Sequence, residues 1–349
     1  MKSSIKTAIA SFGMSGLVFH GPFLKTNPGF EVVSILERTK SVSQLMFPNA
    51  KIVRNYDEIL NDQEIELVIV NTPDEFHYEM AVAALNAGKH IVVEKPVTLR
   101  SGEAMELLKL SVEKQKVFTV FQNRRWDNDF LTVKNILAGG KLGRLIEFES
   151  HYDRYRTTIT PDTWKEEAGE FAGVLYNLGS HMVDQVFVLF GKPNAVTAHL
   201  KTVRNGGFVS DYYDVRLEFK GFSAILKCSY LVHTSGPRYM IHGENGSFFK
   251  FGIDPQEELL KNGNLPVGEE WGNEPPQFWG TLYFTKNGKS SEEKIETVAG
   301  NYHGFYNNVF EAIRNGAELL VKPEEAIEVL KILEACVISN KERKTIFLQ

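Results

Sequence analysis

The first third of the chain alternates between short apolar runs and segments with a helical pattern. The apolar runs are rich in β-branched residues, as expected of strands buried on both faces of a sheet, and span residues 5–10, 31–36, 66–71, 90–94 and 117–121. Apolar residues recur at helical spacing in segments 15–25, 75–87 and 102–116. Strands that alternate with helices of this length predict right-handed βαβ crossovers and a doubly wound parallel sheet.

Beyond about residue 125 the pattern becomes that of a mostly antiparallel sheet. Strand-like runs separated by turn signals such as Asn205-Gly206-Gly207 occupy residues 145–155, 195–203, 212–219, 223–232, 239–242 and 247–251. Helical patterns occupy residues 171–189, 305–314 and 324–340. We therefore expect an α/β domain over residues 1–123 and an α+β domain with an open sheet over residues 124–349. The sequence leaves open whether the last two helices pack back on the first domain.

Composition excludes several classes of protein. The 349 residues carry 39 Lys and Arg against 44 Asp and Glu, a net charge of −5, without a dense basic stretch that would hold a nucleic-acid backbone or an anionic membrane. The two cysteines, Cys228 and Cys336, predict no disulfide framework, and no His, Asp or Glu spacing predicts a metal site. We expect a cytoplasmic protein with a small-molecule substrate and no nucleic-acid or membrane partner.

A glycine-containing turn directly follows the first expected strand and opens the first helix. It reads Ser11-Phe12-Gly13-Met14-Ser15-Gly16, with serine in place of the usual first glycine of a dinucleotide-binding turn. Glycines allow the backbone to approach a pyrophosphate, whose charge the helix N-terminus stabilises. Taken alone, the turn is equally compatible with an ordinary strand–helix connection. The residues that we expect to contact a dinucleotide are Ser11, Gly13, Met14, Ser15 and Gly16.

The end of the second expected strand supports dinucleotide binding. Glu37 lies 21 positions after Gly16, near the offset of ~20 residues at which a ribose-binding group is found. A carboxylate there favours the two ribose hydroxyls of NAD, whereas a guanidinium favours the 2′-phosphate of NADP. Because Arg38 and Thr39 follow Glu37, we expect NADP, with NAD as the alternative. The alternative is that Glu37 and Arg38 form a solvent-exposed pair at the start of a helix and have no role in cofactor binding.

Two further segments follow strands of the expected parallel sheet. Thr72 and Pro73 come after the strand 66–71, with His77 on the next helix. Glu94 ends the strand 90–94, and Lys95 directly follows it. Ligands on open α/β sheets bind at the carboxyl ends of the strands. These five residues are therefore further candidates for the cofactor site.

A polar helix face carries candidates for proton transfer. Asn177, His181 and Asp184 occupy positions i, i+4 and i+7, so all three project from one face of an otherwise apolar helix. The spacing is compatible with a buried histidine and its hydrogen-bond partner as well as with a catalytic group.

The ordered set of these motifs resembles the Gfo/Idh/MocA family of nicotinamide-dependent oxidoreductases. The resemblance rests on the glycine turn, on Glu94-Lys95-Pro96 and on Gly179-Ser180-His181 with Asp184, and it covers nearly the whole chain. Residues 19–23, 123–127, 150–156 and 236–239 are similar to the branch that includes NADP-dependent scyllo-inositol dehydrogenase. The resemblance implies an N-terminal Rossmann domain and a C-terminal α+β domain whose open sheet mediates dimer or tetramer contacts.

The resemblance also implies roles for individual residues. Lys95 matches the lysine that binds the substrate hydroxyl beside the nicotinamide, and His181 matches the histidine that takes the proton of that hydroxyl. Asn177 stands where many relatives carry an aspartate, and an amide can hydrogen-bond a hydroxyl but cannot accept its proton. We expect His181 and Lys95 to suffice for catalysis, with Asp184 as a possible aid; loss of activity is the alternative.

The expected substrate is a secondary alcohol of a cyclitol or sugar. Its candidate contacts, beside Asn177, His181 and Asp184, follow strand ends that should face the cleft: Asn123, Arg124, Tyr152 and Arg156. We therefore predict an NAD(P)-dependent dehydrogenase that forms a homodimer or homotetramer. Two alternatives remain, a non-catalytic NAD(P)-sensing regulator, which Asn177 favours, and an NAD-dependent glycosidase on the same fold.

Overall fold

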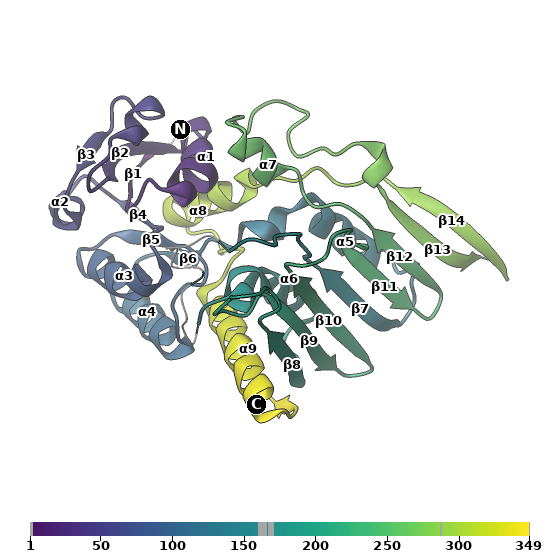
Figure 1. Ribbon diagram of the computed structural model, residues 1–349. Helices are drawn as coiled ribbons and strands as arrows, with labels where there is room; N and C mark the ends of the chain where they lie inside the picture. Colours follow the sequence, from purple (N-terminus) through teal and green to yellow (C-terminus); the bar gives the residue numbers. More distant parts are fainter. Residues whose placement is uncertain (1–2, 160–165, 167–170, 287, 349) are drawn as a thin grey trace. The chain divides into compact units, whose positions relative to one another are not determined.

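The computed structural model describes residues 3–159, 166, 171–286 and 288–348, which form two compact units (Figure 1). Unit 1 comprises the chain up to Trp126 together with Pro255–Gly272 and Asn301–Ile327. Unit 2 comprises Asp127–Asp254, Asn273–Gly300 and the chain from Glu328 onward. The single boundary drawn at residue 123 therefore lies close to the first crossing between the units, and two later segments return to unit 1.

Unit 1 contains a six-stranded parallel sheet with the order β3-β2-β1-β4-β5-β6, which confirms the predicted doubly wound Rossmann fold. The central strand β4 is buried along its whole length because helices cover both faces of such a sheet. The strand β3 was not predicted, because its three residues are too few to show a period. The strands are β1 Ile5–Ile9, β2 Phe30–Leu36, β3 Lys51–Val53, β4 Leu67–Val70, β5 His90–Val93 and β6 Phe118–Val120.

The helices of unit 1 begin and end at recognisable signals. Asn55 caps α2 by accepting a hydrogen bond from the Asp57 amide, and Gly316 ends α8 in the left-handed conformation. The long helical patterns of the first third are all present. The elements are the π-helical η1 Ser15–His20, α1 Gly21–Thr26, η2 Val42–Leu45, α2 Tyr56–Asn61, η3 Asp74–Phe76, α3 His77–Asn86, α4 Ser101–Glu113, η4 Asn123–Trp126, α7 Gln256–Lys261 and α8 His303–Asn315; α9 Pro323–Glu342 begins in unit 1 and continues in unit 2.

Aromatic packing explains why α8 belongs to unit 1. The ring of Phe305 lies 4.9 Å from that of Phe121, and the ring of Tyr306 lies 5.5 Å from that of Phe30, both edge to face. All four side chains are buried. The question that the sequence left open is therefore answered for α8, which supplies part of the core beside β2 and β6.

Unit 2 contains a nine-stranded sheet with the order β14-β13-β12-β11-β7-β10-β9-β8-β15. It is mostly antiparallel, as predicted, with β7 and β10 as a parallel pair. The hairpin β13–β14 was not expected because β14, with the sequence KSSEEKI, has no apolar face. The strands are β7 Leu145–His151, β8 Ala195–Lys201, β9 Tyr212–Phe219, β10 Phe222–Ser229, β11 Tyr239–Gly243, β12 Gly246–Lys250, β13 Gly280–Lys286, β14 Lys289–Ile295 and β15 Ile346–Phe347.

The helices of unit 2 cover one face of this sheet. The ring of Phe190, at the end of α6, packs edge to face on Phe148 of β7 at 5.4 Å. The predicted helix 171–189 is observed as the π-helical η6 followed by α6, and its first three residues lie outside any helix. The helical elements of this unit are α5 Asn128–Ala138, η6 Leu175–Gly179, α6 Ser180–Phe190 and the short η7 Pro276–Phe278.

Candidate active site

The glycine turn connects β1 to η1 and leaves backbone open at its tip. A Cβ atom at Gly16 would lie 2.4 Å from the Ser11 carbonyl oxygen, so only glycine allows the helix to start this close to the strand. A Cβ at Gly13 would meet nothing nearer than Ser11 Oγ, at 3.9 Å. The side-chain amide of Asn71, directly after β4, donates a hydrogen bond of 2.8 Å to the Ser11 carbonyl. The ends of β1 and β4 therefore form one fixed surface.

This surface fits a dinucleotide. Asn71 Oδ1 and Thr72 Oγ1 are buried and have no hydrogen-bond partner within the part of the chain that the structure describes. Buried polar atoms without a partner are uncommon and often indicate a ligand. The apolar side chain of Met14 is 63% exposed beside the open backbone of Gly13. A pyrophosphate at the turn and a polar cofactor group near Thr72 would use these features.

The Glu37 carboxylate is engaged by backbone amides. Its two oxygens accept hydrogen bonds from the amides of Val42 and Ser43, at 3.0 and 2.8 Å, and the residue is almost fully buried. The carboxylate thus holds the first turn of η2. Arg38 and Thr39, which follow it, are exposed. Of the residues predicted to select the cofactor, these two present accessible donors.

Arg54, which is not among the residues predicted for the site, fixes the segment that carries Arg38 and Thr39. Its guanidinium donates hydrogen bonds to the carbonyl oxygens of Glu37 and Lys40 and to Ser41 Oγ. No motif marks this arginine, because it lies 17 residues from Glu37 and just beyond the short strand β3.

His77 joins the loops that follow β4 and β5. Its Nδ1 lies 2.8 Å from the carbonyl oxygen of Pro96, and its Nε2 lies 2.9 Å from that of Thr72. The ring is completely buried. The structure thus places His77 behind the predicted cofactor residues Thr72 and Pro73, as a support for their loop.

Glu94 is the centre of a largely buried hydrogen-bond network at the end of β5, and its own side chain is 12% exposed. Its Oε1 accepts hydrogen bonds from Ser15 Oγ at 2.7 Å and from His20 Nε2 at 3.1 Å, and its Oε2 accepts one from the Lys95 amide at 3.0 Å. The second ring nitrogen of His20 lies 2.6 Å from the hydroxyl of Tyr306 on α8. The network connects the predicted cofactor residue Ser15 to the predicted catalytic residue Lys95.

These contacts keep Glu94 ionised. Burial alone would raise the pKa of its carboxyl group, but the hydrogen bond from His20, the charges of His20 and Lys95 and the hydrogen bond from Ser15 outweigh burial and lower that pKa to about 2. Because an ionised carboxylate only accepts hydrogen bonds, His20 Nε2 carries the proton in its bond to Glu94. A fixed negative charge therefore lies next to Lys95 in the chain.

Arg124, predicted to bind substrate, forms a buried ion pair within unit 1. Its guanidinium contacts the carboxylate of Glu257 on α7, and its side chain is 6% exposed. Burial opposes ionisation of Glu257, yet the nearby charges of Arg124 and Lys261 lower its pKa to about 2. Asn123, beside Arg124 on η4, is likewise buried.

The predicted polar helix face of unit 2 is present, with a π-helical turn inside it. Asn177 lies on η6, and His181 and Asp184 lie on the first turns of α6. His181 and Asp184 are buried, whereas Asn177 is half-buried. π-helical turns inside helices are frequent at functional sites. The structure describes this face within unit 2 and the Glu94 network within unit 1.

Tyr230 connects two of the predicted substrate residues. The Asn177 side chain hydrogen-bonds the Tyr230 hydroxyl, and the Arg156 guanidinium lies 5.6 Å from the centre of the Tyr230 ring. Tyr230 is not among the residues predicted for the site, because it lies within the strand-like run 223–232 and carries no motif. Tyr152, by contrast, is buried inside unit 2, with the guanidinium groups of Arg154 and Arg238 at 5.2 and 4.9 Å from its ring centre.

Comparisons with known proteins agree with the geometry. The family description "Oxidoreductase family, NAD-binding Rossmann fold" matches residues 5–122, and "Oxidoreductase family, C-terminal alpha/beta domain" matches residues 134–348. The chain belongs to the Gfo/Idh/MocA family. As a member, it is an NAD(P)-binding oxidoreductase, and the resemblance inferred from its motifs is confirmed.

Relatives and solved structures match this oxidoreductase along its whole length. It is 42% identical to scyllo-inositol 2-dehydrogenase (NADP(+)) IolW of Bacillus subtilis, over 99% of this chain and 96% of that protein. It is 36% identical to the uncharacterized oxidoreductase YdgJ of Escherichia coli, over the full length of both. The structure of the putative oxidoreductase yvaA from Bacillus subtilis superposes with a TM-score of 0.97 at 41% identity, and each chain is fully covered.

The described residues contain neither a metal-binding cluster nor a membrane-spanning helix. No group of three or more His, Cys, Asp or Glu side chains there is arranged to hold a metal ion. None of the helices in the same residues has the length and apolar character needed to span a membrane.

Proposed function

We propose that this oxidoreductase is an NADP-dependent dehydrogenase that acts on a secondary alcohol of a cyclitol or sugar. The observation that carries the proposal is the near-complete match to a protein named scyllo-inositol 2-dehydrogenase (NADP(+)). A partial match of 28% identity to a protein named inositol 2-dehydrogenase, from Salmonella typhimurium, points to the same substrate class. The buried Glu94 network beside Lys95 and the polar face with His181 supply the groups that the reaction needs.

The preference for NADP is supported by the loop after β2. The Glu37 carboxylate is occupied by two backbone amides, so the pair of ribose hydroxyls that defines NAD has no free carboxylate there. Exposed Arg38 and Thr39 offer donors to a 2′-phosphate. R38A should therefore raise KM for NADP by about tenfold or more and leave KM for NAD nearly unchanged. Equal effects on both cofactors would contradict the assignment.

The proposed mechanism assigns one role to each of the two candidate catalytic residues, Lys95 and His181. A bound nicotinamide supplies the hydride chemistry. The Lys95 ammonium stabilises the negative charge that develops on the substrate oxygen, and the ionised Glu94 next to it offers a compensating charge. His181 takes the proton of the hydroxyl in oxidation and returns it in reduction. Asn177 donates or accepts a hydrogen bond and leaves proton transfer to His181.

The decisive experiment is turnover with matched variants. Purified protein is mixed with NADP or NAD and a panel of inositols, aldoses and amino sugars, and reduced nicotinamide is followed by absorbance. K95A and H181A should lower kcat by at least about a hundredfold while Kd for the cofactor changes little. Cofactor binding without turnover of any substrate would favour the sensing regulator. Release of free sugar from glycosides without net cofactor reduction would favour the glycosidase.

We also propose that the protein forms a homodimer or homotetramer through the nine-stranded sheet. On the face opposite to buried Phe148 and Phe248, the half-buried side chains Met240 of β11 and Phe249 of β12 are directly paired. The exposed Tyr283 of β13 lies diagonally beside Phe249, with the two ring centres 6.1 Å apart. F249E combined with Y283E should convert the oligomer to a monomer in light scattering. A wild-type protein that is monomeric at micromolar concentration would refute the proposal.

The cytoplasm is the compartment that we propose for this enzyme. Cys228 and Cys336 are buried free thiols, as a reducing environment allows.

A further inference from the structure

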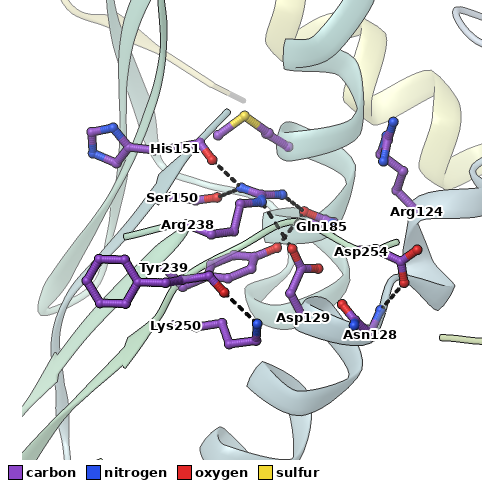
Figure 2. Close-up of polar contacts among 12 residues, drawn as sticks. Arg124, Asn128, Asp129, Ser150, His151, Gln185, Arg238, Tyr239, Lys250 and Asp254 are labelled. Atoms are coloured by element: carbon purple, nitrogen blue, oxygen red, sulfur yellow. Dashed lines mark hydrogen bonds and ion pairs between the residues drawn. The ribbon is translucent and has the colours of Figure 1, made fainter. Parts of the chain in front are cut away.

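Arg238, part of the segment 236–239 to which the proposed reaction assigns no role, is buried in unit 2. Figure 2 shows its guanidinium directed at groups from three elements. It donates hydrogen bonds to Ser150 Oγ, to the His151 carbonyl oxygen at 2.9 Å and to Gln185 Oε1 at 3.2 Å. The rings of Tyr152 and Tyr239 lie 4.9 and 4.4 Å from the guanidinium carbon. The side chain thus connects β7 to α6.

The charge of Arg238 is balanced by Asp129 on α5. Nε of Arg238 lies 3.3 Å from Oδ2 of Asp129, and both side chains are shielded from solvent. Neither carboxylate oxygen of Asp129 has a hydrogen-bond partner among the described residues. A buried pair of this kind adds little net stability but strongly disfavours arrangements in which the two charges separate. The pair therefore fixes the position of the Arg238 guanidinium.

Gln185 connects the Arg238 guanidinium to α6. Its Oε1 accepts hydrogen bonds from Arg238 and, at 2.9 Å, from the Tyr239 hydroxyl. Gln185 lies four residues after His181, so the two side chains lie on the same side of α6, one turn apart. Gln185 also directly follows Asp184. A rotation of α6 that moved His181 would pull Oε1 away from both of its donors.

We propose that Arg238 is a positioning residue, which acts through Gln185 to fix the rotation of α6 and thereby the direction of the His181 imidazole. The inference rests on the proposed function in so far as His181 is the proton-transfer group. Arginine is required because its planar fork reaches Gln185, Ser150 and the His151 carbonyl at once, whereas a lysine ammonium presents a single point of attachment. Proton transfer is sensitive to such placement, since a shift of about 1 Å can lower a rate by about a hundredfold.

The test replaces Gln185 by methionine, which removes the acceptor oxygen Oε1 and keeps the volume of the side chain. Q185M should lower kcat by about tenfold to a hundredfold, shift the pH at which kcat is half-maximal, and leave KM for the cofactor unchanged. Hydrogen exchange of the α6 amides, measured by mass spectrometry on the holoenzyme, should accelerate. Q185E, which retains the acceptor oxygen, should restore protection of α6. If Q185M does not fold, Y239F removes one of the two donors and should show the same changes at smaller size.

The matched control is K250M. Lys250 is also a fully buried cation of unit 2, which contacts Glu274 and the carbonyl oxygens of Phe251 and Phe278. K250M should lower stability without changing kcat, the pH profile or exchange in α6. Unaltered exchange in Q185M, or equal changes in K250M, would overturn the positioning role. Full activity of H181A would instead refute the proposed role of His181. The exchange result would still show whether the contacts of Gln185 with Arg238 and Tyr239 hold α6 in place.

Discussion

Glu94 in unit 1 and Arg238 in unit 2 are both ionised side chains with little exposure to solvent, 12% and 2%, but their surroundings differ. Glu94 accepts hydrogen bonds from Ser15, His20 and the Lys95 amide, so donors satisfy the anion. Arg238 donates to neutral oxygens, and its counter-ion Asp129 lacks hydrogen bonds of its own in the described residues.

The two units stabilise a charged side chain that has little exposure in different ways. In unit 1 the Glu94 carboxylate accepts hydrogen bonds from several donors. The loss of one donor therefore leaves the carboxylate stabilised by the others. In unit 2 the pair depends on Arg238, because Asp129 has no other donor in the described chain to stabilise its charge. Removing one partner should therefore cost more in unit 2 than in unit 1.

The largest effect is expected from R238M. The buried Asp129 carboxylate is left without its cation, so the free energy of unfolding should fall by about 3–5 kcal/mol, as measured by urea denaturation. Adding D129N should recover a large part of the loss, because the stranded charge is then gone. A loss of unfolding free energy below about 1 kcal/mol, or no recovery in the double variant, would contradict the dependence of Asp129 on Arg238.

A smaller loss is expected from E94Q, and it depends on pH. The folded-state pKa of about 2 lies below the unfolded value near 4.5, so ionised Glu94 stabilises the fold by about 3 kcal/mol above pH 4.5. This contribution is lost as the pH falls from about 4.5 to about 2. The difference in unfolding free energy between wild type and E94Q should therefore shrink across that window. A difference that stays constant across this pH range would show that the charge of Glu94 does not stabilise the fold in this way.

Y306F tests the outer end of the network in unit 1. It removes the hydroxyl that lies 2.6 Å from His20 Nδ1 and keeps the aromatic packing of the ring. The expected loss is about 1 kcal/mol in thermal or urea unfolding, together with a modest fall in kcat because His20 orients Glu94. A loss as large as that of R238M would show that unit 1 is no more tolerant than unit 2.

N177D should have the smallest effect on stability, within about 1 kcal/mol, because Asn177 is half-buried. If the face carrying His181 is catalytic, the new carboxylate should preserve or raise kcat, as it can stabilise an imidazolium. Steady-state kinetics across pH measure this. A substantial fall in kcat would show that the amide has a positioning role of its own, through its bond to Tyr230.

Local patterns predicted the elements and the motifs of this protein, but they did not predict which distant side chains meet. The parallel strands β1, β4, β5 and β6 fall in predicted runs, and β2 begins one residue before its run, because burial on both faces leaves an apolar sequence. The strand β3 and the hairpin β13–β14 lack that signal. The contact between His20 and Tyr306, 286 residues apart, leaves no periodic trace in either segment.

The sequence by itself determined the two-part architecture, the glycine turn, the pairing of Glu94 with Lys95 in the chain and the polar face with His181. Each of these depends on residues within a few positions of one another, where spacing alone fixes geometry. Only the tertiary structure decided that Glu37 holds η2, that α8 completes the core of unit 1 and that Arg238 reaches α6. These depend on backbone amides and side chains that folding brings together from far along the chain, and such contacts impose no period on the sequence.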